Sequence, residues 1–277
     1  MDNAYLNFKY KPVKFYLLVF LISWAAFFLS AYFSYSEATA SYKFAFLCIA
    51  ILIPCAVALF MVFGSKNAGL KKDFLHRLTD LKLIKPPYLL FLLLLMPVTV
   101  LLSTAISLLF GRPAAQFAFT PDFFNMGGAA IVVWIMVILA PTFEELGWRG
   151  YGVDSLAKKG RSLFVTTMIF AALWDVWHWP LFLINGYYHN AIMQASFVYG
   201  LNFVVSVFPM AFLHNWVYYR CGRSITAVIL FHAVNNLAMS IWQTEQFTKC
   251  ITTVVLLVFA VIVLWKDKTL WLEKQGQ

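Results

Sequence analysis

Residues 123–149 read FFNMGGAAIVVWIMVILAPTFEELGWR, and this stretch decides how the chain folds. Phe123–Phe143 carries no charge and is long enough to cross the roughly 30 Å of a bilayer's hydrocarbon as a helix. Glu144, Glu145 and Arg149 follow it, so three ionisable groups lie at or inside the membrane. Charged side chains there cost about 2.5–3.5 kcal/mol each and commonly mark a functional site. The stretch therefore indicates a membrane helix that carries chemistry.

The composition of the whole chain is that of a membrane protein. Of its 277 residues, 62% are hydrophobic and 12% are charged, whereas soluble proteins average about 25% charged residues. We predict an all-α, polytopic membrane helical bundle of about eight transmembrane helices, in the plasma membrane of a prokaryote or the endoplasmic reticulum of a eukaryote. It forms one integral-membrane domain, 1–277, with its motif-bearing core at about 125–245. The expected spans are Phe15–Ser36, Phe44–Ser65, Pro86–Gly111, Phe123–Phe143, a fifth beginning at Ser162, a sixth ending near Tyr219, Ser224–Thr244 and Cys250–Trp265.

The positions of the Lys and Arg residues predict the orientation. With the N-terminus inside, 18 of the 21 fall in cytoplasmic segments, which are normally enriched in these residues. Both termini are therefore expected in the cytoplasm, and the net charge of +9 needs no nucleic-acid partner. In the main cytoplasmic segment, Gly64–Lys85, the apolar residues Leu70 and Phe74 recur at helical spacing, and basic residues such as Lys72 and Arg77 lie between and after them. This pattern predicts an amphipathic helix on the inner leaflet.

Two downstream segments add polar groups to predicted membrane helices. His178 lies in Trp-Asp-Val-Trp-His-Trp-Pro, and His232 with Asn236 lies in Phe-His-Ala-Val-Asn-Asn. If the fourth helix continues to Lys158, a rise of about 1.5 Å per residue brings Glu144, His178 and Asn236 to a common depth of roughly 20–24 Å. The three segments are therefore predicted to meet near the middle of the membrane.

Helical spacing gives these side chains different roles. Glu145 and Arg149 are four residues apart, so they can pair on one helix face. Glu144 points about 100° away from Glu145 and is free to face a cavity. His232 and Asn236 are also four residues apart and project side by side.

Two chemistries fit this set of residues. A carboxylate beside an imidazole can take a proton from water and pass it to a leaving amine, while a second imidazole and an amide donate hydrogen bonds to the oxyanion. Asp175, three residues before His178, is expected to fix the tautomer of that ring. The rival is a zinc site made by Glu144, His178 and His232, with an open position for water. The residues alone leave both chemistries open.

These motifs resemble the CPBP family of membrane proteases, whose best-known members are the type II CAAX prenyl endopeptidases. The family pattern is Glu-Glu-x-x-x-Arg, then Phe-x-x-x-His, then His-x-x-x-Asn. The first and third motifs are complete here, whereas Trp174 stands in place of Phe four residues before His178. Each motif alone is weak, but the ordered set is specific.

The resemblance implies a cytosol-open cavity without metal or other cofactor, in which Glu144 and His178 activate the water and His232 and Asn236 form the oxyanion hole. It implies a peptide or protein C-terminus as substrate, of the prenylated CAAX type or simply hydrophobic, with membrane lipid but no nucleic acid as a partner. The alternative is a non-catalytic membrane regulator or bacteriocin-immunity protein on the same fold.

Overall fold

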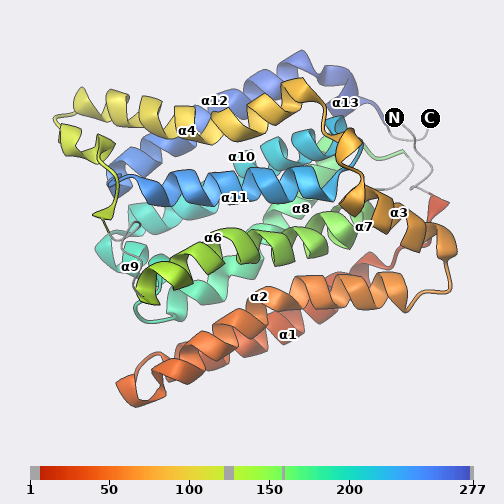
Figure 1. The fold of residues 1–277 in the computed structure, drawn as a ribbon, viewed down its shortest axis with the longest axis horizontal. Coiled ribbons are helices and arrows are strands. Elements are labelled where there is room, and N and C mark those ends of the chain that lie inside the picture. The colour runs from red at the N-terminus through yellow and green to blue at the C-terminus, as the bar shows by residue number, and fades with distance from the viewer. Residues whose placement is uncertain (1–6, 122–127, 158–159, 275–277) are drawn as a thin grey trace.

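The computed structural model describes residues 7–121, 128–157 and 160–274 and shows a helical bundle. The long helices run along a common direction, with α1 and α2 on one side and α4 and α12 on the other (Figure 1). The described part of the chain forms no strand, apart from two isolated bridges. The helices are α1 (Pro12–Phe33), α2 (Ala40–Phe63), α3 (Ala68–Thr79), α4 (Pro86–Leu108), α6 (Gly128–Gly147), α7 (Val153–Leu156), α8 (Leu163–His178), α9 (Tyr188–Ala195), α10 (Phe197–Arg220), α11 (Ile225–Ile241), α12 (Gln246–Lys266) and α13 (Lys268–Leu272). Short 3-10 helices are η2 (Glu37–Thr39), η3 (Leu81–Leu83), η4 (Ala114–Phe117) and η6 (Trp179–Leu183), and η5 (Trp148–Gly152) is π-helical.

The long apolar helices confirm an integral, multi-pass membrane protein. Within the described residues, five helices (α1, α2, α4, α10 and α12) are long and apolar enough to cross a membrane. A sixth crossing results if α8 with η6 and α9, which meet at a bend of 79°, form one broken span. Helix α11 is apolar but shorter, and the start of the predicted fourth span at Phe123 lies outside the described residues. The count of eight spans therefore stays a prediction.

Local sequence signals explain where the helices that carry the site begin and end. The hydroxyl oxygens of Ser162 and Ser224 each accept a hydrogen bond from the backbone N–H three residues on, at the starts of α8 and α11. Pro86 opens α4, where its missing N–H costs nothing. Helix α8 ends at His178, and Pro180 lies in the 3-10 helix that follows. Pro180 has no backbone N–H to continue the α-helical pattern, which agrees with the end of α8 at His178.

Two glycines allow close packing around the Glu-Glu motif. A Cβ atom at Gly147 would lie 2.5 Å from the backbone of Pro54, so α2 approaches α6 more closely than any larger residue permits. A Cβ atom at Gly150 would lie 2.8 Å from the ring of Phe74 in α3. The motif segment is therefore fixed between α2 and α3.

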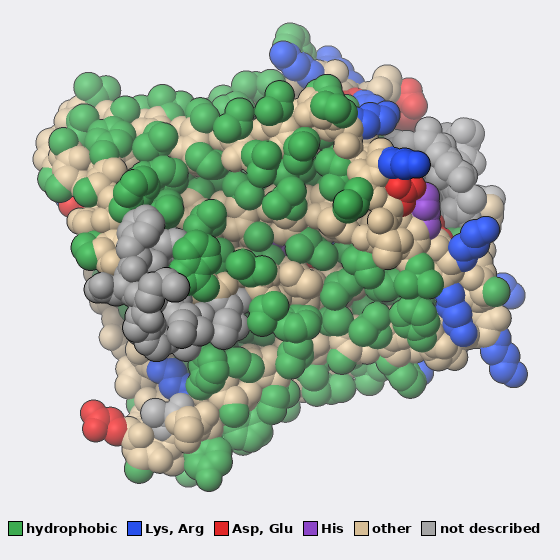
Figure 2. Space-filling model, viewed as in Figure 1, with side chains coloured by type: hydrophobic (Ala, Val, Ile, Leu, Met, Phe, Trp, Pro, Cys, Tyr) green, Lys and Arg blue, Asp and Glu red, His purple; other side chains and the backbone are tan. Residues whose placement is uncertain are grey.

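The charged side chains gather at one end of the bundle. Figure 2 shows apolar side chains over the middle of the visible face, while most Lys and Arg side chains lie at the end where α3 and α13 lie in Figure 1. We call this the basic end. The apolar middle is what a helix bundle exposes to lipid, and its exposed side chains include Leu94, Leu102 and Val258. Which side of the membrane the basic end faces stays a prediction.

Candidate active site

The helix that carries the two glutamates does not end at them. Helix α6 continues through the π-helical turn Trp148–Gly152 into α7, which ends at Leu156. The predicted continuation is thus confirmed as far as Leu156, and Lys158 lies outside the described residues. Single π-helical turns are often found at functional sites. Because of the continuation, Glu144 and Glu145 are buried inside the bundle rather than solvated at its end.

The predicted pair of Glu145 and Arg149 is present. Arg149 Nη1 donates to both carboxylate oxygens of Glu145, at 3.0 and 2.8 Å, and both residues are completely buried. Arg149 Nη2 donates to Oδ1 of Asn215 in α10 at 3.1 Å, and the guanidinium lies 4.7 Å from the ring centroid of Phe170. A buried ion pair needs such additional partners to offset its lost hydration.

Glu145 has a second partner that the sequence reasoning missed. Its Oε1 lies 2.9 Å from Nδ1 of His232 in α11. Because the adjacent guanidinium of Arg149 favours an ionised Glu145, the carboxylate accepts and His232 Nδ1 donates. The carboxylate that neutralises the arginine therefore also orients one of the candidate oxyanion-hole residues.

Glu144 and His178 both meet Trp174, on α8. The indole Nε1 of Trp174 donates to Glu144 Oε2 at 3.1 Å. The backbone carbonyl oxygen of Trp174 accepts from His178 Nδ1 at 2.7 Å. A carbonyl only accepts, so Nδ1 carries the proton and Nε2 of the neutral ring has a free lone pair. His178 is thereby set in the tautomer that a general base requires.

The predicted role of Asp175 is wrong. Its Oδ2 accepts from Trp179 Nε1 at 3.1 Å, four residues further along the chain, and it makes no bond to His178. The imidazole instead uses the carbonyl one turn earlier on its own helix, and His214 makes the same local contact with Met210 at 2.7 Å. This local acceptor removes the need for a carboxylate partner.

One internal cavity brings the four predicted catalytic residues together. It has a volume of about 840 Å³ and is lined by Glu144, His178, His232 and Asn236, together with side chains that are mainly apolar or aromatic. Glu145 does not line it, in agreement with the predicted division between the two glutamates. Residues more than 90 positions apart in sequence thus line the same cavity.

The cavity has a further histidine that the sequence analysis did not identify. His189 of α9 lines it, is buried, and has no hydrogen-bond partner on either ring nitrogen within the described residues. Its ring lies 6.0 Å from that of His178, with 14° between the planes. No motif marks this residue, because only the bend after α8 brings α9 back over the site.

The cavity occupies the half of the bundle away from the basic end. Its lining residues on α10 run from Tyr199 to Met210, in the first half of that helix, and those on α11 begin at His232 and continue to Ser240. Between the cavity and the basic end lie the buried side chains of Glu145, Arg149 and Asp154. The side of the membrane to which this cavity opens stays a prediction, as does the cytoplasmic placement of both termini.

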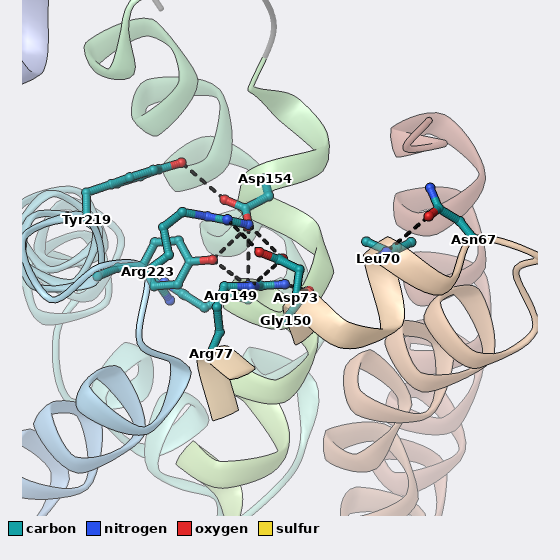
Figure 3. Close-up of polar contacts among 10 residues, drawn as sticks. Asn67, Leu70, Asp73, Arg77, Arg149, Gly150, Asp154, Tyr219 and Arg223 are labelled. Carbon is teal, nitrogen blue, oxygen red and sulfur yellow. Dashed lines mark hydrogen bonds and ion pairs between the residues drawn. The ribbon is translucent and has the colours of Figure 1, made fainter. Parts of the chain in front are cut away.

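Buried charges fill the basic end beneath the site (Figure 3). Arg77 of α3 is only 1% exposed, so its predicted place on the polar face of a surface helix is wrong. It donates to the backbone oxygens of Arg149 and Gly150 at 2.8 and 3.1 Å, and to Asp73 at 2.7 Å. It also lies 3.3 Å from Asp154. Helix α3 is thus bound to the π-helical turn that carries Arg149.

A second arginine completes this cluster. Arg223, in the turn before α11, donates to the two carboxylate oxygens of Asp73 at 2.9 and 3.1 Å and also pairs with Asp154. The two arginines and two aspartates balance in charge, and Tyr218 adds a hydrogen bond to Asp154 at 2.7 Å. A buried network of this kind rigidifies the segments that it joins, here α3, the start of α7 and the turn before α11.

The predicted zinc set does not coincide with the closest group of metal-type ligands. Among the residues that the structure describes, Glu145, His214 and His232 have ligand atoms within 4.8 Å of one another. Both oxygens of Glu145 already accept from Arg149, and Nδ1 of His232 bonds to Glu145. A divalent cation there would face a buried guanidinium at short range, so these donors fit a metal poorly.

Fold and cavity together define a class of protein: a multi-pass helical membrane protein with a mainly apolar cavity into which a few polar, enzyme-like side chains project. Residues 126–238 match the family described as Type II CAAX prenyl endopeptidase Rce1-like. A relative from Methanococcus maripaludis, named CAAX prenyl protease 2, is 36% identical over 270 residues, which cover 98% of this chain and 99% of the relative. The chain belongs to the CAAX prenyl endopeptidase family and is a membrane protease.

Proposed function

We propose that the protein hydrolyses peptide bonds with a water molecule that Glu144 and His178 activate, while His232 and Asn236 stabilise the oxyanion. The observation that carries this proposal is the shared cavity, into which α6, α8 and α11 bring these four side chains. Burial in an apolar surrounding strengthens each electrostatic interaction between them and a substrate.

Glu144 and His178 can activate water because the hydrogen bonds that each makes leave it a free acceptor site. Nε2 of His178 has its lone pair because Nδ1 donates to a carbonyl, and Glu144 keeps acceptor capacity beyond its bond from Trp174. The water oxygen attacks the carbonyl carbon while its proton passes to this pair. The proton then moves to the amide nitrogen, the C–N bond breaks, and a carboxylic acid and an amine leave.

The contact between His232 and Glu145 specifies how the oxyanion is stabilised. With Nδ1 donating to Glu145, His232 carries a proton on Nε2 only as an imidazolium. The imidazolium and the amide of Asn236, one turn further on α11, then donate to the developing negative charge.

No step of this mechanism uses a metal ion. The carboxylate and imidazole move the proton, and the imidazolium and amide offset the negative charge. We therefore propose a metal-independent hydrolase. The alternative is a zinc ion bound by Glu144, His178 and His232, and sensitivity to chelators distinguishes the two.

The substrate is proposed to be a hydrophobic peptide or a protein C-terminus, prenylated or not. The relative from Methanococcus maripaludis is named for prenylated CAAX substrates. Apolar residues, among them Leu181, Ile192 and Phe203, line the cavity and suit either an isoprenoid or large aliphatic side chains.

Proteolysis by the purified protein in lipid nanodiscs tests the proposal. A farnesylated CAAX peptide is compared with unprenylated hydrophobic peptides, for the native protein and for Glu144→Ala. Cleavage should fall by about 10²–10⁴-fold in the variant, the usual contribution of a general base. Native-like cleavage by Glu144→Ala would refute the mechanism, and cleavage of no peptide by the native protein would favour the non-catalytic regulator.

A further inference from the structure

Trp174 contacts three of the four proposed catalytic residues, Glu144, His178 and His232. It lines the cavity and is 5% exposed. Its ring centroid lies 5.7 Å from those of both His178 and His232. Its indole N–H and its backbone carbonyl bond to Glu144 and His178, respectively. One residue on α8 thus touches side chains from α6, α8 and α11.

The indole and the carbonyl of Trp174 do different things. The backbone carbonyl sets the tautomer of His178, and any residue at this position supplies it. The indole N–H bonds to Oε2 of Glu144 at 3.1 Å, and only a side chain with a donor at that place can do so. An N–H donor holds the carboxylate in one rotamer and stabilises its ionised form. Exchange of the side chain alone therefore isolates the second effect.

We propose that the indole N–H of Trp174 positions Glu144 for water activation, a role that the Phe of the family pattern cannot fulfil. This inference rests on the proposed function, because it assigns Trp174 to the orientation of the same carboxylate. Trp174 acts through Glu144 and is a positioning residue. Phe would fill most of the same space but would leave Oε2 without this donor.

The test is Trp174→Phe, with Trp177→Phe as the matched control. Trp177 lies on the same helix and lines the same cavity, and its ring centroid lies 4.9 Å from that of His178. Unlike that of Trp174, its indole N–H has no hydrogen-bond partner within the described residues. Both variants lose the same atoms, so a packing effect appears in both. Only Trp174→Phe removes a hydrogen bond to Glu144.

For Trp174→Phe we expect kcat to fall about 3- to 10-fold with KM within about 2-fold, since one neutral donor to the base is lost. The acidic limb of the pH–rate profile should move up by about 0.5–1 pH unit, because a carboxylate without its donor protonates more readily. Trp177→Phe should leave that limb in place. If Trp174→Phe folds poorly, β-(3-benzothienyl)alanine at position 174 replaces the N–H by sulfur at nearly constant shape and should give the same shift.

An unmoved acidic limb with native kcat in Trp174→Phe, or in the benzothienyl variant, would overturn the inference. So would an equal shift in Trp177→Phe, because the cause would then be packing. The proposed function fails separately: if Glu144→Ala cleaves normally, the mechanism is wrong, whereas an inactive Glu144→Ala beside a native-like Trp174→Phe refutes only the role of Trp174.

Discussion

Removal of one or the other of two adjacent glutamates should abolish activity in both cases but should destabilise the protein strongly in only one. Glu145→Ala removes the only carboxylate that contacts Arg149 among the described residues, so a fully buried guanidinium is left without a counter-charge. The remaining contacts of Arg149, with Asn215 and aromatic ring faces, carry no negative charge. Glu144→Ala removes a carboxylate that lines the cavity, where water can take its place.

The magnitudes follow from these surroundings. A buried charge that loses its partner costs about 3–5 kcal/mol, so Glu145→Ala should lower the folding equilibrium constant by roughly 10²–10³-fold or more, at about 1.4 kcal/mol per factor of ten. Glu144→Ala removes the acceptor of the Trp174 indole N–H, which should lower the free energy of unfolding by about 1 kcal/mol. Replacement of both Glu145 and Arg149 by Leu should recover much of the stability that Glu145→Ala loses, because no unpaired charge remains.

Unfolding in mixed micelles, followed by tryptophan fluorescence and circular dichroism, measures the stability, and peptide cleavage measures the activity. Glu144→Ala should be stable and inactive, while Glu145→Ala should be unstable and inactive. Glu145→Gln, which keeps a carbonyl acceptor, should lie between the native protein and Glu145→Ala in stability. Equal unfolding midpoints for Glu144→Ala and Glu145→Ala would refute the division of labour between the two carboxylates.

Three further predictions concern the metal, Asp175 and the topology. Cleavage should stay within about 2-fold after prolonged EDTA or o-phenanthroline, and a loss that only Zn²⁺ restores would establish a zinc site. Asp175→Asn should leave kcat and the pH profile nearly native, because a carbonyl holds His178; a loss of about 10-fold or more would restore the carboxylate partnership. Single cysteines in a cysteine-free background should react with impermeant reagents from the cytoplasm at Lys72, and only from outside at Glu37 and at Gln243, which lines the cavity. Labelling of Gln243 from the cytoplasm would overturn the charge-based orientation and give a cytosol-open cavity.

The features that the sequence predicts correctly are those set by local periodicity. A helix places residues four apart on one face, so the pair of Glu145 and Arg149 follows from spacing and is present at 2.8 Å. The same rule separates Glu144 from Glu145, and the cavity indeed takes only the first. Uncharged runs of sufficient length predict membrane helices because unpaired backbone groups are too costly in lipid. The residues that meet in the cavity were also predictable, because helix rise converts sequence distance into depth.

Three features required the tertiary structure. Sequence spacing allows Asp175 to pair with His178. In the structure Asp175 bonds to Trp179 and His178 bonds to the carbonyl of Trp174, and side-chain directions within one helical turn decide between these partners. Arg77 was placed at the surface because cations usually are, yet it is buried against carbonyl groups of a segment 72 positions away. The contact of Glu145 with His232 joins helices 87 positions apart.

The sequence by itself thus determined the helices, their apolar character and the ordered motifs, because these depend on neighbours within one or two turns. The tertiary structure alone decided which polar groups become partners and where the cavity lies. Helices in a bundle can rotate about their axes and shift along them with little change in the local sequence pattern, and a rotation of a few tens of degrees exchanges one hydrogen-bond partner for another. Packing fixes those rotations, as the close contacts of Gly147 with α2 and of Gly150 with α3 illustrate.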